Sequence, residues 1–126
     1  MSRHRILSVG QCGFDHGRIS RHLHQTLAAD VEGAHGADDA LAALQRESFD
    51  LVLVNRINDA DGAPGIELIR RLKSDPALAD LPVMLVSNYP DAQAEAVALG
   101  ALPGFGKSEL TATATTDRLR ELLGQS

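Results

Sequence analysis

Asn55, Ser87 and Lys107 each follow a short apolar run, and all three carry polar atoms that could take part in chemistry. A serine hydroxyl and a lysine ammonium can bind an anion. A carboxylate at position 55 could act as a nucleophile or hold a hard cation. The amide of Asn55 does neither well at neutral pH. The residue types therefore predict a polar site whose central residue does not react.

The run at 49–54, which Asn55 closes, is typical of a fully buried central strand in a parallel sheet. Gly10 and Gln11 follow a similar run at 6–9. Carboxyl ends of parallel strands share one edge of the sheet, where α/β proteins keep their binding crevice. We therefore expect one group of neighbouring residues at this edge: Gly10, Gln11, Asn55, Ser87 and Lys107.

Alternating strand and helix signals extend over the whole chain. Strands are expected at five apolar runs: 6–9, 31–34, 49–55, 83–87 and 102–106. A helix is expected after each strand, with the helices marked by Ile19, Leu23 and Leu27; by residues 37–44; by Ile66, Ile69 and Leu72; by residues 91–100; and by Leu119, Leu122 and Leu123. This order predicts one α/β domain over residues 1–126. Its fold would be a doubly wound, flavodoxin-like (βα)5 with a five-stranded parallel sheet.

Composition limits the function classes. The chain has 126 residues, 44% of them hydrophobic but only 3% aromatic, which suits helices packed on a parallel sheet. Its net charge of -5 and the lack of a basic run argue against nucleic acid as a partner. The single Cys12 excludes an internal disulfide, and we find no signal peptide or membrane span. We expect a cytoplasmic protein without a cofactor.

Several stretches together resemble the receiver domain of bacterial response regulators. They are residues 49–55, the segment Gly65-Ile66-Glu67-Leu68-Ile69-Arg70-Arg71-Leu72, the segment Leu81-Pro82-Val83-Met84-Leu85-Val86-Ser87, residues 96–101, and Lys107. The resemblance covers almost the whole chain. It implies a module of two-component (phosphorelay) signal transduction.

The resemblance also assigns roles to positions. Asn55 falls where the family has the phosphoaccepting aspartate, and Ser87 and Lys107 fall where side chains contact the phosphoryl oxygens. The acidic pair that holds Mg²⁺ falls on Gly10 and Gln11 if the strand is aligned, or on Gln11 and Cys12 if the following helix is aligned. Neither alignment supplies a carboxylate, so we expect no metal. The resemblance thus implies a degenerate pseudo-receiver.

The output side departs from the family as well. Gly104 stands where family members usually carry an aromatic switch residue, and the loop after Asn55 is about two residues longer than usual. In that loop, Asp59 or Asp61 could pair with Lys107, which would otherwise be ready for a small anion. Cys12 and His16 lie four residues apart in a segment expected to be a loop, so we predict no metal site there.

Small residues gather on the fourth and fifth strand–helix units. They are Ala92 and Ala96 on the expected helix and Gly104 and Gly106 around Phe105. One interpretation is close packing of this helix on its own strand. The other is a docking face for a second copy or for another signalling protein.

We expect a signalling module, not an enzyme, that acts by protein contact and without phosphorylation. Two alternatives remain open. The chain could be a flavodoxin-like module that binds a small anion or a nucleotide. It could also be a receiver that is still phosphorylated, on Asp59 or Asp61.

Overall fold

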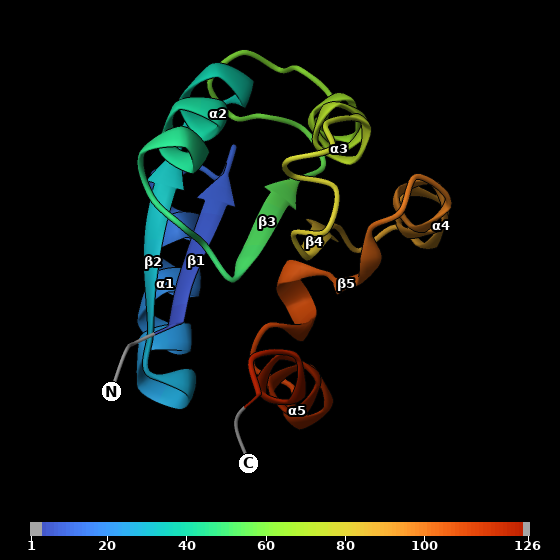
Figure 1. Ribbon diagram of the computed structural model, residues 1–126. Helices are drawn as coiled ribbons and strands as arrows, with labels where there is room; N and C mark the ends of the chain where they lie inside the picture. Colours follow the sequence, from blue (N-terminus) through green and yellow to red (C-terminus); the bar gives the residue numbers. More distant parts are fainter. Residues whose placement is uncertain (1–3, 125–126) are drawn as a thin grey trace.

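The computed structural model describes residues 4–124 and has the predicted alternation of strands and helices (Figure 1). The strands are β1 His4–Val9, β2 Ala29–Ala34, β3 Leu51–Asn55, β4 Val83–Val86 and β5 Leu102–Phe105. The helices are α1 Gly13–Leu27, α2 Ala37–Arg46, α3 Gly65–Ser74, α4 Pro90–Ala98 and α5 Thr113–Leu122, with a short 3-10 helix at Lys107–Glu109. No helix among residues 4–124 is both long and apolar enough to cross a membrane.

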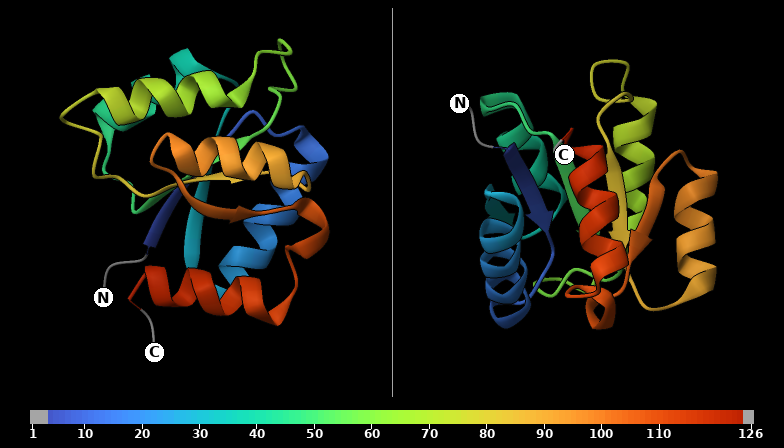
Figure 2. Two further views of the ribbon diagram at one scale, coloured as in Figure 1. Left: turned by 90° about the vertical axis from the view of Figure 1, so that its right-hand side faces the viewer. Right: turned by 90° about the horizontal axis from the view of Figure 1, so that it is seen from below.

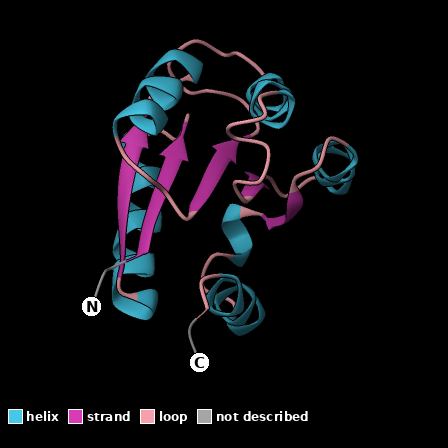
Figure 3. Ribbon diagram, viewed as in Figure 1, coloured by secondary structure: helices cyan, strands magenta, loops and turns pink. Residues whose placement is uncertain are grey.

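The strands form one parallel sheet in the order β2-β1-β3-β4-β5, so the predicted flavodoxin-like (βα)5 fold is confirmed. Helices α1 and α5 cover one face of the sheet, and α2, α3 and α4 cover the other (Figures 1 and 2). Figure 3 shows loops at both ends of the strands. Because neighbouring strands are parallel, the carboxyl ends of β1, β3 and β4 meet at one edge of the sheet.

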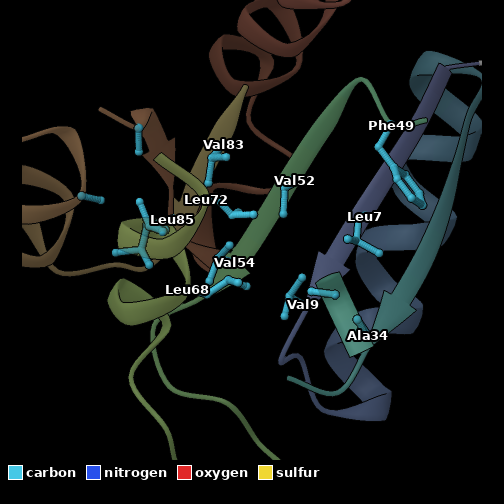
Figure 4. Close-up of a cluster of buried hydrophobic side chains, with 14 of the residues drawn as sticks. Leu7, Val9, Ala34, Phe49, Val52, Val54, Leu68, Leu72, Val83 and Leu85 are labelled. Carbon is cyan, nitrogen blue, oxygen red and sulfur yellow. The ribbon is translucent and has the colours of Figure 1, made fainter. Parts of the chain in front are cut away.

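Burial on both faces explains why the β3 run is continuously apolar. Leu51 and Leu53 pack against α1 and α5, whereas Val52 and Val54 pack against α2 and α3. Figure 4 shows Val52 and Val54 in the second of these clusters. Each such side chain contributes about 1.5 to 3 kcal/mol when it is fully buried. Central β3 is thereby fixed in register, and Asn55 is held at its end.

Several boundaries differ from the prediction. Strand β2 begins at Ala29 and β3 at Leu51, two residues earlier and two later than expected. Helix α1 begins at Gly13, so Cys12 is its N-cap and His16 lies in the helix, where a loop was expected. The 3-10 helix after β5 was not predicted.

The β4–β5 edge contains a register shift between Met84 and Val86 that α4 compensates. Gln93 Nε2 donates to the carbonyl oxygens of Leu85 and Ser87, at 2.9 and 3.1 Å, and its Oε1 accepts from the Gly104 N–H at 2.9 Å. One side chain thus replaces sheet hydrogen bonds that the shift removes.

The residues predicted to form a docking face on the fourth and fifth strand–helix units are not available for one. Ala96, Phe105 and Gly106 are buried, and Ala92 packs on the core. A Cβ at Gly104 would lie 2.0 Å from the Leu85 carbonyl oxygen. The small residues therefore serve close packing within the chain, which is the other interpretation considered above.

Candidate functional site

Asn55 is the centre of a hydrogen-bonded junction at the end of β3. Its Nδ2 donates to the carbonyl oxygen of Gly10 at 3.0 Å and to that of Ile57 at 2.7 Å. Its Oδ1 accepts from the Arg56 N–H at 3.1 Å. The amide joins the end of β1 to the start of the β3–α3 loop and uses both of its N–H groups to do so. A carboxylate in this place has no N–H to give.

The lengthened β3–α3 loop closes over the end of β1. Asn58 is only 6% exposed, and its side chain occupies the space that a side chain at Gly10 would need, since a Cβ there would lie 2.2 Å from Asn58 Oδ1. The Asp59 N–H donates to the Gly10 carbonyl oxygen at 2.9 Å. Gly10 also has a φ of +80°, a conformation that favours glycine. An acidic residue at position 10 would therefore strain the backbone and displace the Asn58 side chain.

Lys107 is paired with a carboxylate that the sequence did not indicate. Its Nζ lies 2.7 Å from Oδ2 of Asp15, in the first turn of α1. The Lys107 hydrogen bond holds the pKa of Asp15 below its ordinary value, against the opposing effect of partial burial. Cys12 Sγ donates to the same oxygen at 3.3 Å. The prediction that Asp59 or Asp61 pairs with Lys107 is wrong.

A cavity of about 240 Å³ opens beside this junction. Polar and apolar residues line it: Asn55, Arg56, Ile57, Val86, Ser87, Asn88, Tyr89 and Lys107. Arg56 stacks over the Tyr89 ring, with 4.7 Å between the guanidinium carbon and the ring centroid. Ser87 is buried, and its Oγ accepts from the Tyr89 N–H at 3.1 Å. Asn55, Ser87 and Lys107 thus meet as predicted.

Gln11 does not join them. It lines a second cavity with Ser8 and His16, on the side of β1 that faces β2. Gly10 takes part in the junction only through its backbone. The expected cluster at the strand ends is therefore divided between two cavities.

One carboxylate of the long loop, that of Asp61, has a structural role. Asp61 Oδ1 accepts from the Ala63 N–H at 2.9 Å, which closes the turn, and Asp59 lies at the second cavity. Within residues 4–124, no three His, Cys, Asp or Glu side chains come close enough together to hold a metal ion.

Three residues of the site were missed by sequence reasoning: Asp15, Arg56 and Asn58. Asp15 is 92 residues from Lys107 in the chain, so only the tertiary fold reveals the pair. Arg56 directly follows Asn55 at the end of a central strand, and this position was a usable signal. Asn58 carried a signal only as part of a loop longer than the family's.

No family model matches the chain. A gliding motility regulatory protein from Myxococcus xanthus is 33% identical over 91 residues, which are 70% of this chain and 11% of that protein. The chain thus corresponds to a small part of that relative's length.

Solved receiver domains match almost all of the chain. The signal receiver domain of a DNA-binding response regulator protein from Colwellia psychrerythraea 34H superposes with a TM-score of 0.82 at 26% identity, covering 97% of this chain and 99% of that one. For a response regulator from Thermotoga maritima the TM-score is 0.78 at 21% identity, with 98% and 100% covered. A receiver domain of a signal transduction histidine kinase from Syntrophus aciditrophicus gives 0.74 at 23%, with 96% and 91% covered. The chain has the fold of two-component receiver domains.

Proposed function

We propose that the chain is a pseudo-receiver, a receiver-type signalling module that acts through contact with another signalling protein and accepts no phosphoryl group. The observation that carries this proposal is the bonding of Asn55. Its side chain lies where the resemblance to receiver domains puts the phosphoacceptor, and both of its N–H groups are bound to backbone carbonyl oxygens. This arrangement is a structural link and offers no nucleophile.

Electrostatics supports the same proposal. Phosphoryl transfer needs cations that offset charge on the attacking and transferred oxygens. By resemblance, the acidic pair that would hold Mg²⁺ falls on Gly10 and Gln11 or on Gln11 and Cys12, and neither pair supplies a carboxylate. The one strong cation that the family uses at this edge, Lys107, is already neutralised by Asp15. The charge at this site is therefore balanced without a phosphoryl group or a metal ion.

The Asp15–Lys107 pair explains how one state is kept. In a site without the acceptor carboxylate, Lys107 would be a partly buried charge without a counterion, which is costly. Asp15 on α1 supplies that counterion from a different element. The pair joins α1 to the segment that follows β5, two elements that lie on the same side of the sheet. We infer that it replaces the phosphorylation-dependent arrangement by a permanent one.

The test uses another signalling protein as the binding partner, for example a histidine kinase. Its affinity for the wild-type protein is measured by calorimetry with and without acetyl phosphate and Mg²⁺. The proposal predicts binding whose dissociation constant does not change. A gain or loss of tenfold, about 1.4 kcal/mol, on addition of acetyl phosphate would refute it.

A second candidate function is favoured by the charges that line the first cavity. Among the described residues, Arg56 lines it together with Lys107, whose charge Asp15 offsets, and no carboxylate lines it. This composition suits a small anion such as phosphate, as expected for an anion-binding module. Phosphate should then raise the thermal unfolding midpoint of the wild type but not of Arg56→Met. Arg71→Met, at an exposed position on α3, is the matched control.

A further inference from the structure

A groove between α3 and α4 has no role in the function proposed above. The two helices lie side by side on one face of the sheet (Figures 1 and 2). The groove has a volume of about 140 Å³ and a mostly apolar lining: Arg56, Ile57, Pro64, Ile66, Leu85, Ala92 and Glu95. Ile57 is 38% exposed, and Tyr89, which stacks with Arg56 beside the groove, is 59% exposed. Exposed apolar side chains with a polar rim are a feature of interaction surfaces.

Opposite charges mark the two ends of this surface. Among the described residues that line the groove, Arg56 is the one cation and Glu95 the one carboxylate. The Arg56 guanidinium lies on the Tyr89 ring and forms no ion pair with residues 4–124. At the other end, the hydrogen bond to Glu67, at 2.5 Å, and the charge of Glu95 raise the pKa of Arg70. Two carboxylates thus face one guanidinium there, so that end is negative.

The spacing of these residues makes the surface complementary to itself. Tyr89, Ala92 and Glu95 follow one another at intervals of three along one side of α4, with Ala92 midway. At 1.5 Å per residue, Tyr89 and Glu95 are about 9 Å apart along the helix axis. A twofold axis over Ala92 therefore places Tyr89 of one copy against Glu95 of the other. Because Arg56 lies on Tyr89, each Arg56 then meets the Glu95 of the opposite copy, as a twofold interface requires.

Ala92 is the floor of the groove at this midpoint. Its side chain packs on the core, and its small size leaves room for two α4 helices to approach each other. The surface lies on the α3 side of α4, whereas Gln93 and Gly104 bond to each other on the β5 side. It is therefore distinct from the small-residue face at β5 that the chain uses for its own packing.

We propose that the α3–α4 groove joins two copies of this chain in a twofold dimer, in which Arg56 of each copy pairs with Glu95 of the other. Ile57 and Tyr89 would be covered in this dimer. The proposal does not depend on the function proposed above, because the contact uses neither Asn55 nor a phosphoryl group. The surface is small, so we expect a weak dimer, with a dissociation constant between about 10 µM and 1 mM.

The experiment is sedimentation equilibrium of the whole chain in a buffer without phosphate. Arg56→Glu and Glu95→Arg should each weaken the dimer at least about tenfold, because like charges then face each other. The double variant with both changes restores opposite charges and should dimerise within about threefold of the wild type. Arg21→Glu on α1 and Glu121→Arg on α5 make the same charge changes at exposed positions on the other face of the sheet. These two controls should dimerise as the wild type does.

Tyr89 provides a second measurement that locates the contact. It is the only tyrosine of the chain, and there is no tryptophan, so tyrosine emission reports this surface alone. Emission should change on dilution with the dissociation constant that sedimentation gives. Thermal melts of the single variants should match that of the wild type, which separates loss of the dimer from loss of the fold.

Four results would overturn the proposal. One is a wild-type protein that stays monomeric at about 1 mM. Another is a single charge reversal, at Arg56 or at Glu95, that leaves the dimer unchanged. The third is a double variant that dimerises no better than the single ones. The last is a dimer whose formation leaves the Tyr89 emission unchanged, since the contact would then lie on another face.

Discussion

Replacing Asn55 by aspartate should destabilise the protein instead of restoring a receiver. The new carboxyl keeps the hydrogen bond from the Arg56 N–H but loses both donors. Each lost bond contributes about 1 kcal/mol. The ionised group would also face the carbonyl oxygens of Gly10 and Ile57, which adds a further penalty of about 1 to 2 kcal/mol. Asn55→Asp should therefore lower the free energy of unfolding by about 3 to 4 kcal/mol at pH 7.

The loss of unfolding free energy in Asn55→Asp should depend on pH in a defined direction. Because two carbonyl oxygens oppose the charged form, the folded-state pKa of the new carboxyl should lie above the unfolded value of about 3.9. The charge penalty is then fully present above the folded pKa and disappears as the pH falls below the unfolded value. Asn55→Ala, which loses the same bonds without a charge, should show a deficit that does not vary with pH.

Urea unfolding at several pH values measures this effect. With a slope of about 1.5 kcal/mol/M, the midpoint of Asn55→Asp should fall by about 2 to 3 M at pH 7. Adding Asp15→Asn releases Lys107 to pair with the new carboxyl, so the double variant should recover about 1 kcal/mol beyond additivity. An Asn55→Asp protein as stable as the wild type at pH 7 would refute this account of the junction.

Three further predictions concern single features. Asp15→Asn should lower the free energy of unfolding by about 1 kcal/mol at pH 7. Because the folded-state pKa of Asp15 is depressed, its contribution is present above the unfolded pKa and is lost as the pH falls through the folded pKa. The urea midpoints of Asp15→Asn and of the wild type should therefore converge in acid. Gly104→Ala should lower the free energy of unfolding by at least about 2 kcal/mol, because its Cβ would meet the Leu85 carbonyl oxygen. Gly13→Ala should be nearly neutral, and thermal melts of both variants measure the difference. Calorimetry should show Mg²⁺ binding weaker than about 1 mM, and a tighter constant would contradict the absence of a metal site.

The fold could be predicted because its signals are local. Central strands β3 and β4 are buried on both faces and so appear as unbroken apolar runs, with loop residues at each end. The start of β3 was predicted two residues early because Phe49 is buried like a strand residue but precedes the sheet. Asn55, Ser87 and Lys107 followed from the strand ends alone.

The rest of the site depends on contacts that the sequence does not encode locally. Gly10 turns the chain with a positive φ, so strand alternation no longer predicts where Gln11 points. Asp15 looked like an ordinary first-turn carboxylate, and its partner lies at the far end of the chain. A sequence alignment also could not show that Asn58 fills the space that a side chain at Gly10 would need.

Phosphoryl transfer to the wild-type protein tests the central claim most directly. The protein is incubated with acetyl phosphate and Mg²⁺, and separately with a phosphorylated histidine kinase, and its intact mass is then measured. Our account predicts an unchanged mass in both cases, and the same for Asn55→Asp within the time that labels an intact receiver. A phosphoryl adduct on the wild type that is lost in Asp59→Asn or Asp61→Asn would contradict it, because the long loop would then carry a working acceptor.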